Sequence, residues 1–260
     1  MSARPVEPVP GAGVWLAVAD GRAEITLGRA EQRNTLDSRA FAGLAGALRS
    51  VDRDPSVSGV LLTSSVADVF CSGGSYADPD DPDRPSPSYG PQLTACFDLW
   101  TARRVPVVSV VAGAARAFGA ALALTSDLTI ATPAASFGLP ELSGGVVPAF
   151  AIALLRTRHV SRTVRELVLT TCVVSAADAA RRGLVTVVAP DCGSAEREAR
   201  AVLDRWSRMG PDVVREAVSA LAGIDAAPDH AAVRRIAVAG VAEQLRRYGA
   251  GRSSQRYLDP

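Results

Sequence analysis

The 260-residue sequence predicts an α/β fold, and three observations carry that prediction. Apolar runs alternate with segments of helical spacing, as in residues 13–29, 37–54 and 59–65. The run "GVLLTSS" (59–65) is continuously apolar, which is typical of a strand covered on both faces. Hydrophobic residues make up 48% of the chain and charged residues 21%, so a sizeable core can form. Strands and helices that alternate in this way favour α/β units.

The chain begins with a hairpin and a capped helix. Residues 13–29, "GVWLAVADGRAEITLGR", contain two β-like runs around Asp20-Gly21, a pair that favours a tight hairpin turn. Residues 37–54 have apolar side chains at helical spacing, and Asp37 is expected to cap that helix. Residues 75–91 are rich in Pro, Asp and Ser, so we expect a mobile loop or a lid there.

The remaining chain alternates strands and helices and ends in a mostly helical region. Ser175 can cap a short helix that Gly183 ends. We expect a core over residues 1–191 and a helical C-terminal subdomain over residues 192–260. The elements expected after the loop are helix 92–102, strand 105–113, helix 117–127, strand 128–133, strand 184–190 and two arginine-rich amphipathic helices at 193–209 and 231–248.

Composition argues against several classes of function. A net charge of +1 provides no field that attracts nucleic acid, and every basic residue is an arginine. The four cysteines show no CxxC spacing and the two histidines form no metal motif, so we expect reduced thiols and no metal site. The N-terminus lacks the apolar segment of a secretory signal, which favours a cytoplasmic protein. Residues 105–124 are long enough to span a bilayer, but Arg116 near their middle costs about 2.5–3.5 kcal/mol there, so no membrane association is expected.

Two turns in the sequence can present free backbone N–H groups. In "VFCSGGSY" (69–76), the adjacent Gly73 and Gly74 allow positive φ and outward-facing N–H groups, although a plain β-turn is the more usual interpretation of an isolated "SGGS". In "AGAARAFGAAL", a strand ends at Gly113 and a helix opens near Phe118. If the two turns meet, they form an oxyanion hole, which stabilises an enolate by about 3–4 kcal/mol per donor.

The ordered motifs of residues 14–190 resemble those of the crotonase superfamily, the enoyl-CoA hydratase/isomerase family. "DVFCSGGSY" is similar to F-[SC]-A-G-A-D, and "FGLPELSGGVVP" is similar to F-G-x-P-E-x-x-x-G-x-x-P. Between them, "VPVVSVVAGAARAFGAALALTSDLTIA" is similar to the family's strand, glycine-rich turn and helix. The resemblance implies a crotonase (ClpP-like) ββα superhelix with a C-terminal helical trimerisation region. It also implies a homotrimer or hexamer that binds an acyl-CoA or an acyl carrier.

The resemblance assigns roles to individual positions. It implies that the N–H groups of Gly74 and Phe118 hold the thioester oxygen, and that the ring of Phe118 narrows or reshapes the acyl pocket. Ser72 lies where family members contact the adenine end of CoA through backbone carbonyls. No cofactor is expected beyond the coenzyme A of the substrate. A phosphate clamp would have to be arginine, with Arg29, Arg33 and Arg252 as candidates.

The acids at the site determine the expected reaction. Hydratases of the family use two glutamates, and the two corresponding positions here are Ala121 and Glu141. Adding water to a double bond needs two positioned groups, so Ala121 disfavours ordinary hydratase chemistry. The resemblance also implies that Ala121 lies where the substrate or CoA binds. One base facing an oxyanion hole can still move a proton. We therefore expect an isomerase in which Glu141 is the catalytic residue.

Three alternatives remain open at the level of sequence. Glu141 could be a surface acid or a helix cap. Decarboxylation or C–C cleavage needs the oxyanion hole but no base, and His230, Tyr76 or Tyr89 could then orient a carboxylate or deliver a proton. A silent CoA-binding scaffold would keep the fold without turnover. Altered pocket positions, such as Ala149 where the family has a glycine, favour an unusual acyl group from a specialised biosynthetic pathway or a member whose activity has drifted.

Overall fold

The computed structural model describes residues 5–227, 229, 231–232, 234–236 and 238–239. The chain divides into two compact units, one ending at Arg215 and one beginning at Glu216. This division lies later in the chain than the boundary expected at residue 192, because helix α7 (Cys192–Met209) packs on the main sheet of the first unit. The expected helix 231–248 falls largely outside the described residues.

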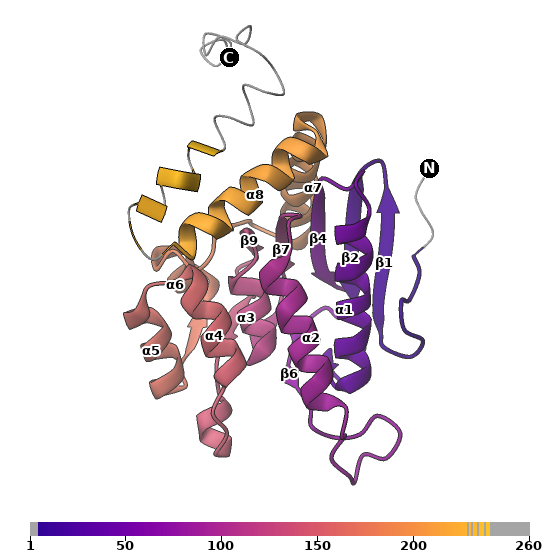
Figure 1. Cartoon of the computed structure of the whole chain (residues 1–260). Coiled ribbons are helices and arrows are strands. Elements are labelled where there is room, and N and C mark those ends of the chain that lie inside the picture. Colours follow the sequence, from indigo (N-terminus) through magenta and orange to yellow (C-terminus); the bar gives the residue numbers. More distant parts are fainter. Residues whose placement is uncertain (1–4, 228, 230, 233, 237, 240–260) are drawn as a thin grey trace, which may run out of the picture. The chain divides into compact units, whose positions relative to one another are not determined.

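Within the described residues, the largest sheet has the strand order β1-β2-β4-β7-β9-β12 (Figure 1). Strands β1 and β2 pair antiparallel across Asp20 and Gly21, whose φ values of 51° and 73° are those of a tight hairpin turn. The other pairs are parallel. The strands are β1 (Val14–Ala19), β2 (Arg22–Leu27), β4 (Gly59–Ser64), β7 (Val107–Val111), β9 (Leu128–Ala131) and β12 (Val187–Val188).

A smaller sheet has the order β11-β10-β8-β5, and β3 pairs with β6 in a two-stranded ladder. Each of β4, β7 and β9 is followed at once by one strand of the smaller sheet, so the chain alternates between the two sheets. This repeated pair of strands is the ββα unit of the expected superhelix. The bounds are β3 (Thr35–Leu36), β5 (Val69–Cys71), β6 (Gly73–Gly74), β8 (Ala114–Arg116), β10 (Ser136–Gly138) and β11 (Val173–Ser175).

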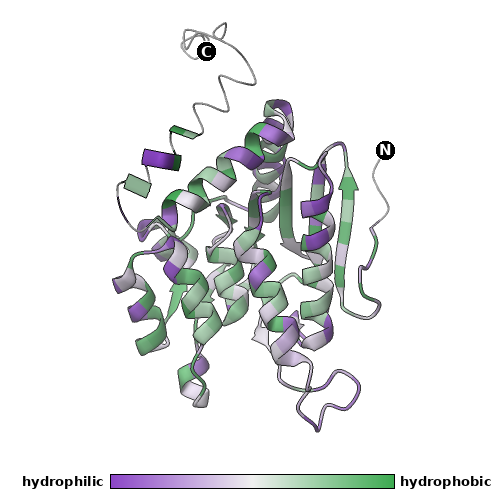
Figure 2. Ribbon diagram, viewed as in Figure 1, coloured by the Kyte–Doolittle hydropathy of each residue, from purple (hydrophilic) through white to green (hydrophobic). Residues whose placement is uncertain are grey.

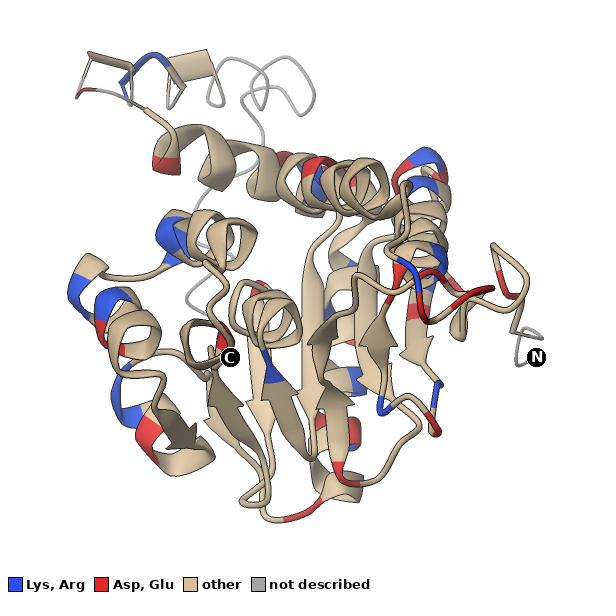
Figure 3. Ribbon diagram, turned by 90° about the horizontal axis from the view of Figure 1, so that it is seen from below, with Lys and Arg blue, Asp and Glu red and all other residues tan. Residues whose placement is uncertain are grey.

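Helices cover both faces of the main sheet, as the continuous apolar run of β4 predicts. Successive side chains of a strand point to opposite faces. Val60 and Leu62 therefore join the larger core cluster, whereas Leu61 packs with Leu203 of α7 on the other face. Strands are largely hydrophobic, and charged residues lie mainly on helices and turns (Figures 2 and 3). The other helices are α1 (Ser38–Arg53), α2 (Tyr89–Ala102), α3 (Phe118–Leu124), α4 (Ala149–Arg158), α5 (Ser161–Thr170), α6 (Ala176–Arg181) and α8 (Pro211–Asp225), with the 3-10 helix η1 (Glu141–Gly144).

The segment between β6 and α2 is tied to the rest of the unit by short polar side chains. The buried Ser86 donates its hydroxyl to the Ser38 hydroxyl (3.0 Å) and its backbone N–H to the Tyr76 carbonyl (2.8 Å). Arg39 pairs with Asp80 (2.6 Å). Helix α2 begins at Tyr89 rather than at residue 92, so Tyr89 is a buried helical residue instead of part of the expected loop.

The other expected cap positions agree with the structure. The Asp37 carboxylate accepts the Ala40 N–H (2.8 Å) at the start of α1, and the Ser175 hydroxyl accepts the Asp178 N–H (3.1 Å) at the start of α6. In the described part of the chain, no helix combines the length and the apolar character that a bilayer crossing requires.

Candidate active site

A pocket of about 540 Å³ lies in the first unit and brings together three of the expected site residues. Gly74, Phe118 and Glu141 all contribute to its wall. Apart from Glu141, the lining is largely apolar and aromatic, which suits an acyl chain better than a sugar or a nucleotide. We call it the Glu141 pocket. Its remaining lining residues are Tyr76, Tyr89, Gly90, Leu93, Ala117, Pro140, Gly144, Val146, Val147, Pro148, Ala149, Phe150 and Ala151.

The topology of the smaller sheet explains why these residues meet. Strands β5, β8 and β10 are adjacent and parallel, so their carboxyl ends lie at the same edge. Gly74 follows the end of β5, Phe118 follows β8 and Glu141 follows β10, each within three residues. Three successive ββα repeats therefore contribute one group each to a single place.

The Gly73-Gly74 turn depends on glycine at both positions. Gly73 has a φ of 102°, and a Cβ there would overlap the Cβ of Ala117, so the turn after β5 lies directly against the turn before α3. The Ser75 N–H donates to the Leu36 carbonyl of β3 (2.9 Å). Because successive N–H groups of a strand point to opposite sides, the Gly74 N–H points away from β3.

The second turn holds the Phe118 N–H in a fixed direction. Phe118 is the first residue of α3, so its N–H has no partner within the helix. The preceding Ala117 has a φ of 52° and a ψ of −130°, a conformation that side-chain-bearing residues rarely adopt and that costs about 1–3 kcal/mol. Its N–H donates to the Gly138 carbonyl (2.9 Å), which fixes the turn to β10.

The Phe118 ring forms part of the pocket wall while most of it lies in the core. The residue is 6% exposed, and its ring packs edge-on against Phe41 with centroids 5.2 Å apart. The ring is therefore held by the core, so the pocket wall at this position is rigid.

Glu141 carries an unusual carboxylate. Its Oε2 atom is buried and has no hydrogen-bond partner among the described residues. Burial raises the pKa of the Glu141 carboxyl above its usual value. The backbone is fixed at the start of η1, where the Val146 N–H donates to the Glu141 carbonyl (3.0 Å). An unsatisfied carboxylate with a raised pKa in a pocket is the physical signature of a functional acid or base.

Ala121 is in the core of α3 and is fully buried. It is not among the residues that line the Glu141 pocket. Its carbonyl accepts the hydroxyl of Thr125 (2.6 Å), as expected inside a packed helix. The expectation that Ala121 contacts substrate therefore has no counterpart in the geometry, and the position contributes no acid.

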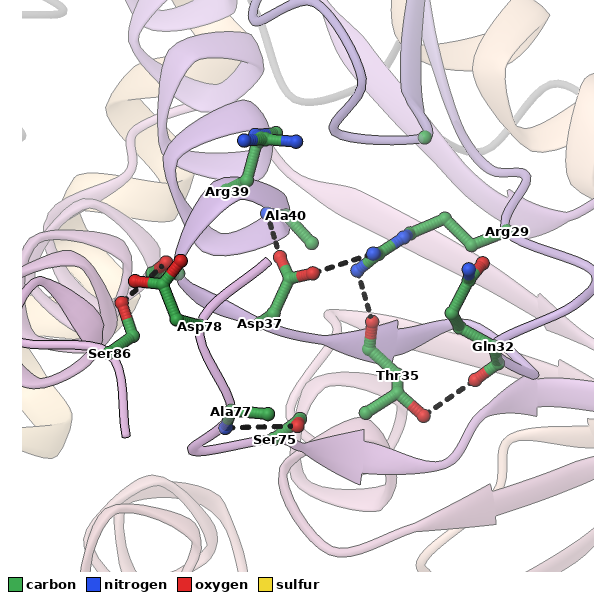
Figure 4. A network of polar contacts seen from close by, with 12 residues as sticks. Arg29, Gln32, Thr35, Asp37, Arg39, Ala40, Ser75, Ala77, Asp78 and Ser86 are labelled. Carbon is green, nitrogen blue, oxygen red and sulfur yellow. Dashed lines mark hydrogen bonds and ion pairs between the residues drawn. The ribbon is translucent and has the colours of Figure 1, made fainter. Parts of the chain in front are cut away.

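Neither Arg29 nor Arg33, two of the arginines expected as a phosphate clamp, lines the Glu141 pocket. Figure 4 shows the polar contacts of Arg29. Arg29 is paired with Asp37 (2.6 Å) and donates to the Thr35 carbonyl (2.8 Å), so its charge is already neutralised. It borders a separate pocket of about 370 Å³. Arg33 is exposed, and its carbonyl accepts the Ser72 hydroxyl (2.7 Å). Ser72 and Arg33 therefore contact each other, but neither lines the pocket that contains Glu141. Arg252 and His230 lie outside the described residues.

Tyr89 is the site residue whose position the sequence did not reveal. A Cβ at Gly74 would overlap the Tyr89 hydroxyl oxygen, so this hydroxyl lies directly beside the Gly74 backbone. The composition of residues 75–91 obscured the start of α2. The available signal was Pro91, because proline is favoured in the first turn of a helix.

The pocket can support one kind of chemistry from its own groups. Two backbone N–H groups at adjacent strand ends can bind an oxygen that gains negative charge, and the nearby carboxylate can accept and return a proton. In the described part of the chain, no group of three or more His, Cys, Asp or Glu side chains could hold a metal ion.

Comparison with known proteins connects this geometry to a family. The model of the enoyl-CoA hydratase/isomerase family matches residues 18–238. The chain is 32% identical over 202 residues to the probable enoyl-CoA hydratase echA8 of Mycobacterium leprae, covering 75% of this chain and 76% of that protein. It is 31% identical over 206 residues to the probable mitochondrial enoyl-CoA hydratase 2 of Arabidopsis thaliana, covering 77% and 67%.

Solved structures agree on the fold. The enoyl-CoA hydratase of Mycobacterium smegmatis superposes with a TM-score of 0.82 at 22% identity, covering 95% of this chain and 96% of that one. Human enoyl coenzyme A hydratase domain-containing protein 3 superposes with a TM-score of 0.81 at 19% identity, covering 95% and 97%. At these identities the likeness concerns the crotonase fold alone.

Proposed function

Because the chain belongs to the enoyl-CoA hydratase/isomerase family, we propose that it is an enzyme that acts on an acyl-CoA thioester through an enolate. In this proposal the N–H groups of Gly74 and Phe118 bind the thioester oxygen. Glu141 moves a proton between two carbons of the acyl chain, so the reaction is a double-bond isomerisation. An acyl group on a carrier protein would present the same thioester to the same groups.

One observation carries the proposal: the Glu141 carboxylate, whose buried Oε2 atom has no hydrogen-bond partner among the described residues, lies in a pocket with the two candidate backbone donors. With a 3-enoyl thioester, Glu141 takes a proton from C2 while the electrons move onto the thioester oxygen. The resulting acid then returns a proton to C4, and the double bond shifts. One C–H bond breaks and another forms, so no co-reactant is consumed. A raised pKa makes the Glu141 carboxylate a stronger base for the first step.

The missing second acid argues against hydration. Water addition requires one group to activate water and another to manage the proton at the α carbon. Ala121 has no ionisable group and is sealed within α3. Coenzyme A enters only as part of the substrate, and the assembly that we propose is a homotrimer or a hexamer. Light scattering would then report three or six times the chain mass of 26.9 kDa.

The test is a panel of 3-enoyl, 2-enoyl and malonyl-type CoA thioesters, followed by mass spectrometry in deuterium oxide. The wild type is expected to convert 3-enoyl to 2-enoyl thioesters and to exchange protons at the substrate α carbon. Glu141→Gln is expected to lower the isomerisation rate about 1,000-fold while CoA thioester binding is retained. Glu24→Gln, on β2 and paired with Arg200 (3.2 Å), is the matched control.

Other outcomes would contradict the proposal in distinguishable ways. Loss of CO2 from a malonyl-type thioester at the same rate in wild type and Glu141→Gln would indicate a decarboxylase. Binding of CoA thioesters with no turnover by the wild type would indicate a scaffold.

A further inference from the structure

The Tyr89 hydroxyl occupies a specific place in the Glu141 pocket. It lies where the side chain of any residue other than glycine at position 74 would begin. Gly74 is a candidate oxyanion donor, so the Tyr89 O–H lies beside the backbone of that candidate, and both residues line the same pocket. The absence of a Cβ at Gly74 is therefore what makes room for this hydroxyl.

This hydroxyl has no partner within the described part of the chain, although Tyr89 is only 8% exposed and lines the pocket. The hydroxyl of a tyrosine can both donate and accept a hydrogen bond. When it is nearly buried, it normally has a hydrogen-bond partner. The second atom of the same wall without a partner among the described residues is Oε2 of Glu141. Both groups are left open for whatever occupies the pocket.

The surrounding packing fixes the direction of the hydroxyl. The Tyr89 ring packs edge-on against Phe41 at 5.6 Å and lies 4.6 Å from the Tyr76 ring. Its backbone begins α2, where its N–H donates to the Ser86 carbonyl (3.2 Å). A donor held in this way loses little entropy when a ligand arrives, which is the condition for effective stabilisation of a developing charge.

The Tyr89 phenol also stays protonated at neutral pH. Burial raises its pKa above the usual value, and the neighbouring Tyr76 and Glu141 raise it further. A phenol in this state donates a hydrogen bond and keeps its proton. Tyr76, the other tyrosine of the pocket, is 57% exposed.

We propose that the Tyr89 hydroxyl is a third hydrogen-bond donor to the substrate's thioester oxygen, beside the N–H groups of Gly74 and Phe118. This inference rests on the proposed function, since it assigns a further catalytic residue to the same enolate. The phenol stabilises the negative oxygen without transferring its proton, and Glu141 remains the base.

The first test is Tyr89→Phe, which keeps the ring packing and removes only the oxygen. We expect kcat to fall about 100-fold with KM changed less than threefold, because the lost interaction is made mainly in the transition state. Proton exchange at the substrate α carbon should fall in parallel. Thr101→Val removes a hydroxyl from an exposed position of the same helix, where it donates to the Phe97 carbonyl (2.9 Å), and serves as the matched control.

The second test uses the contact with Gly74. Gly74→Ala keeps the backbone N–H but displaces the hydroxyl, so its loss of kcat should resemble that of Tyr89→Phe. The double variant should be no slower than either single variant, because both changes remove the same interaction. Losses that multiply would overturn the inference, as would exchange that persists in Tyr89→Phe while isomerisation is lost, since the phenol would then act at carbon.

A readout without turnover separates this inference from the proposed function. With bound butanoyl-CoA carrying ¹³C at the thioester carbonyl, the carbonyl stretch should move to higher frequency in Tyr89→Phe than in wild type. An unchanged stretch would overturn the inference even if Glu141→Gln abolishes isomerisation. A shifted stretch would uphold it even if the wild type isomerises none of the thioesters tested.

Discussion

At the scale of single residues, Glu141 and Ala117 show how the site costs stability. A buried carboxylate oxygen without a partner is unfavourable when ionised, and a side-chain-bearing residue at φ 52° is strained. Both residues line the same pocket. Buried unpartnered charges and strained backbone are typical of positions where a protein gives up stability for function.

The first consequence concerns pH. Burial raises the pKa of Glu141 in the folded protein, so the folded state binds this proton more tightly than the unfolded state does. The contribution to stability is fully present below the unfolded pKa, near 4.5, and is lost as pH rises through the higher folded pKa. Glu141→Gln is therefore expected to raise the melting temperature at pH 7.

Melting curves of Glu141→Gln, Glu24→Gln and wild type between pH 4 and pH 8 measure this effect. The advantage of Glu141→Gln should shrink as the pH is lowered toward 4. An advantage that is independent of pH would show that charge burial is not its cause. In the wild type, kcat/KM should fall on the acid side at a pH above 4.5, because the base must be ionised.

At the scale of elements, α3 packs closely against β5, so the two turns that hold the proposed backbone donors lie next to each other. A Cβ at Gly119 would lie 2.5 Å from the Cys71 Cβ and 2.7 Å from the Cys71 carbonyl oxygen, so only glycine lets α3 approach β5 this closely. Alanine usually stabilises a helix by about 1 kcal/mol relative to glycine. At Gly119, the free energy that the clash costs exceeds this gain, because the strand backbone at Cys71 cannot move aside as a flexible side chain does.

Gly119→Ala is accordingly expected to lower the free energy of unfolding by about 2 kcal/mol, within the range of an overpacked core. Gly90→Ala, in the first turn of α2 with no atom within 4 Å of the new Cβ, should raise it by about 0.5 kcal/mol. Urea denaturation of both variants measures the difference. Equal effects at the two positions would contradict close packing of α3 on β5.

Elements with a local physical signal could be predicted from the sequence, and those set by distant contacts could not. Asp20-Gly21, Asp37 and Ser175 act through neighbours a few residues away, and each was found where expected. Tyr89 was named as a loop residue, and its burial at the start of α2 was not predicted because it depends on Phe41 and Gly74, which are remote in the chain. The expected strand 184–190 is reduced to Val187–Val188, because only that part pairs with β9.

In the candidate site, too, some features could be predicted from the sequence and others could not. The identities of Gly74, Phe118 and Glu141 could be proposed from motifs, but their convergence follows from the order of β5, β8 and β10 in the smaller sheet. The pairing of Arg29 with Asp37 could not be foreseen, because helical spacing marks Asp37 as a cap and says nothing of a second partner.

At the scale of the whole molecule, the cysteines report on opening of the core. Cys71 and Cys96 are fully buried, and burial raises the pKa of Cys71 to about 12. Cys192 is exposed at the start of α7. A maleimide at pH 8 should therefore modify Cys192 in the folded protein, whereas Cys71 and Cys96 should react only as fast as the core unfolds.

Mass spectrometry of digested, labelled protein over increasing urea concentration follows each thiol. Cys192→Ser should remove the rapid labelling at position 192 and leave the slow phase of Cys71 and Cys96 unchanged, and the partly buried Cys172 is followed as a separate peptide. Rapid labelling of Cys71 without urea would mean that β5 and its pocket edge open locally, before the rest of the unit.

The alternation of the chain between two sheets has a consequence for how such a protein can diverge. Each ββα repeat supplies one residue to the pocket wall, and the ends of neighbouring strands lie about 4.8 Å apart, whatever the length of the connections. A change in one connection thus alters one contribution while the other two keep their positions. The strands keep the pocket in place while the segments that connect them change, so the chemistry of the pocket can change one repeat at a time.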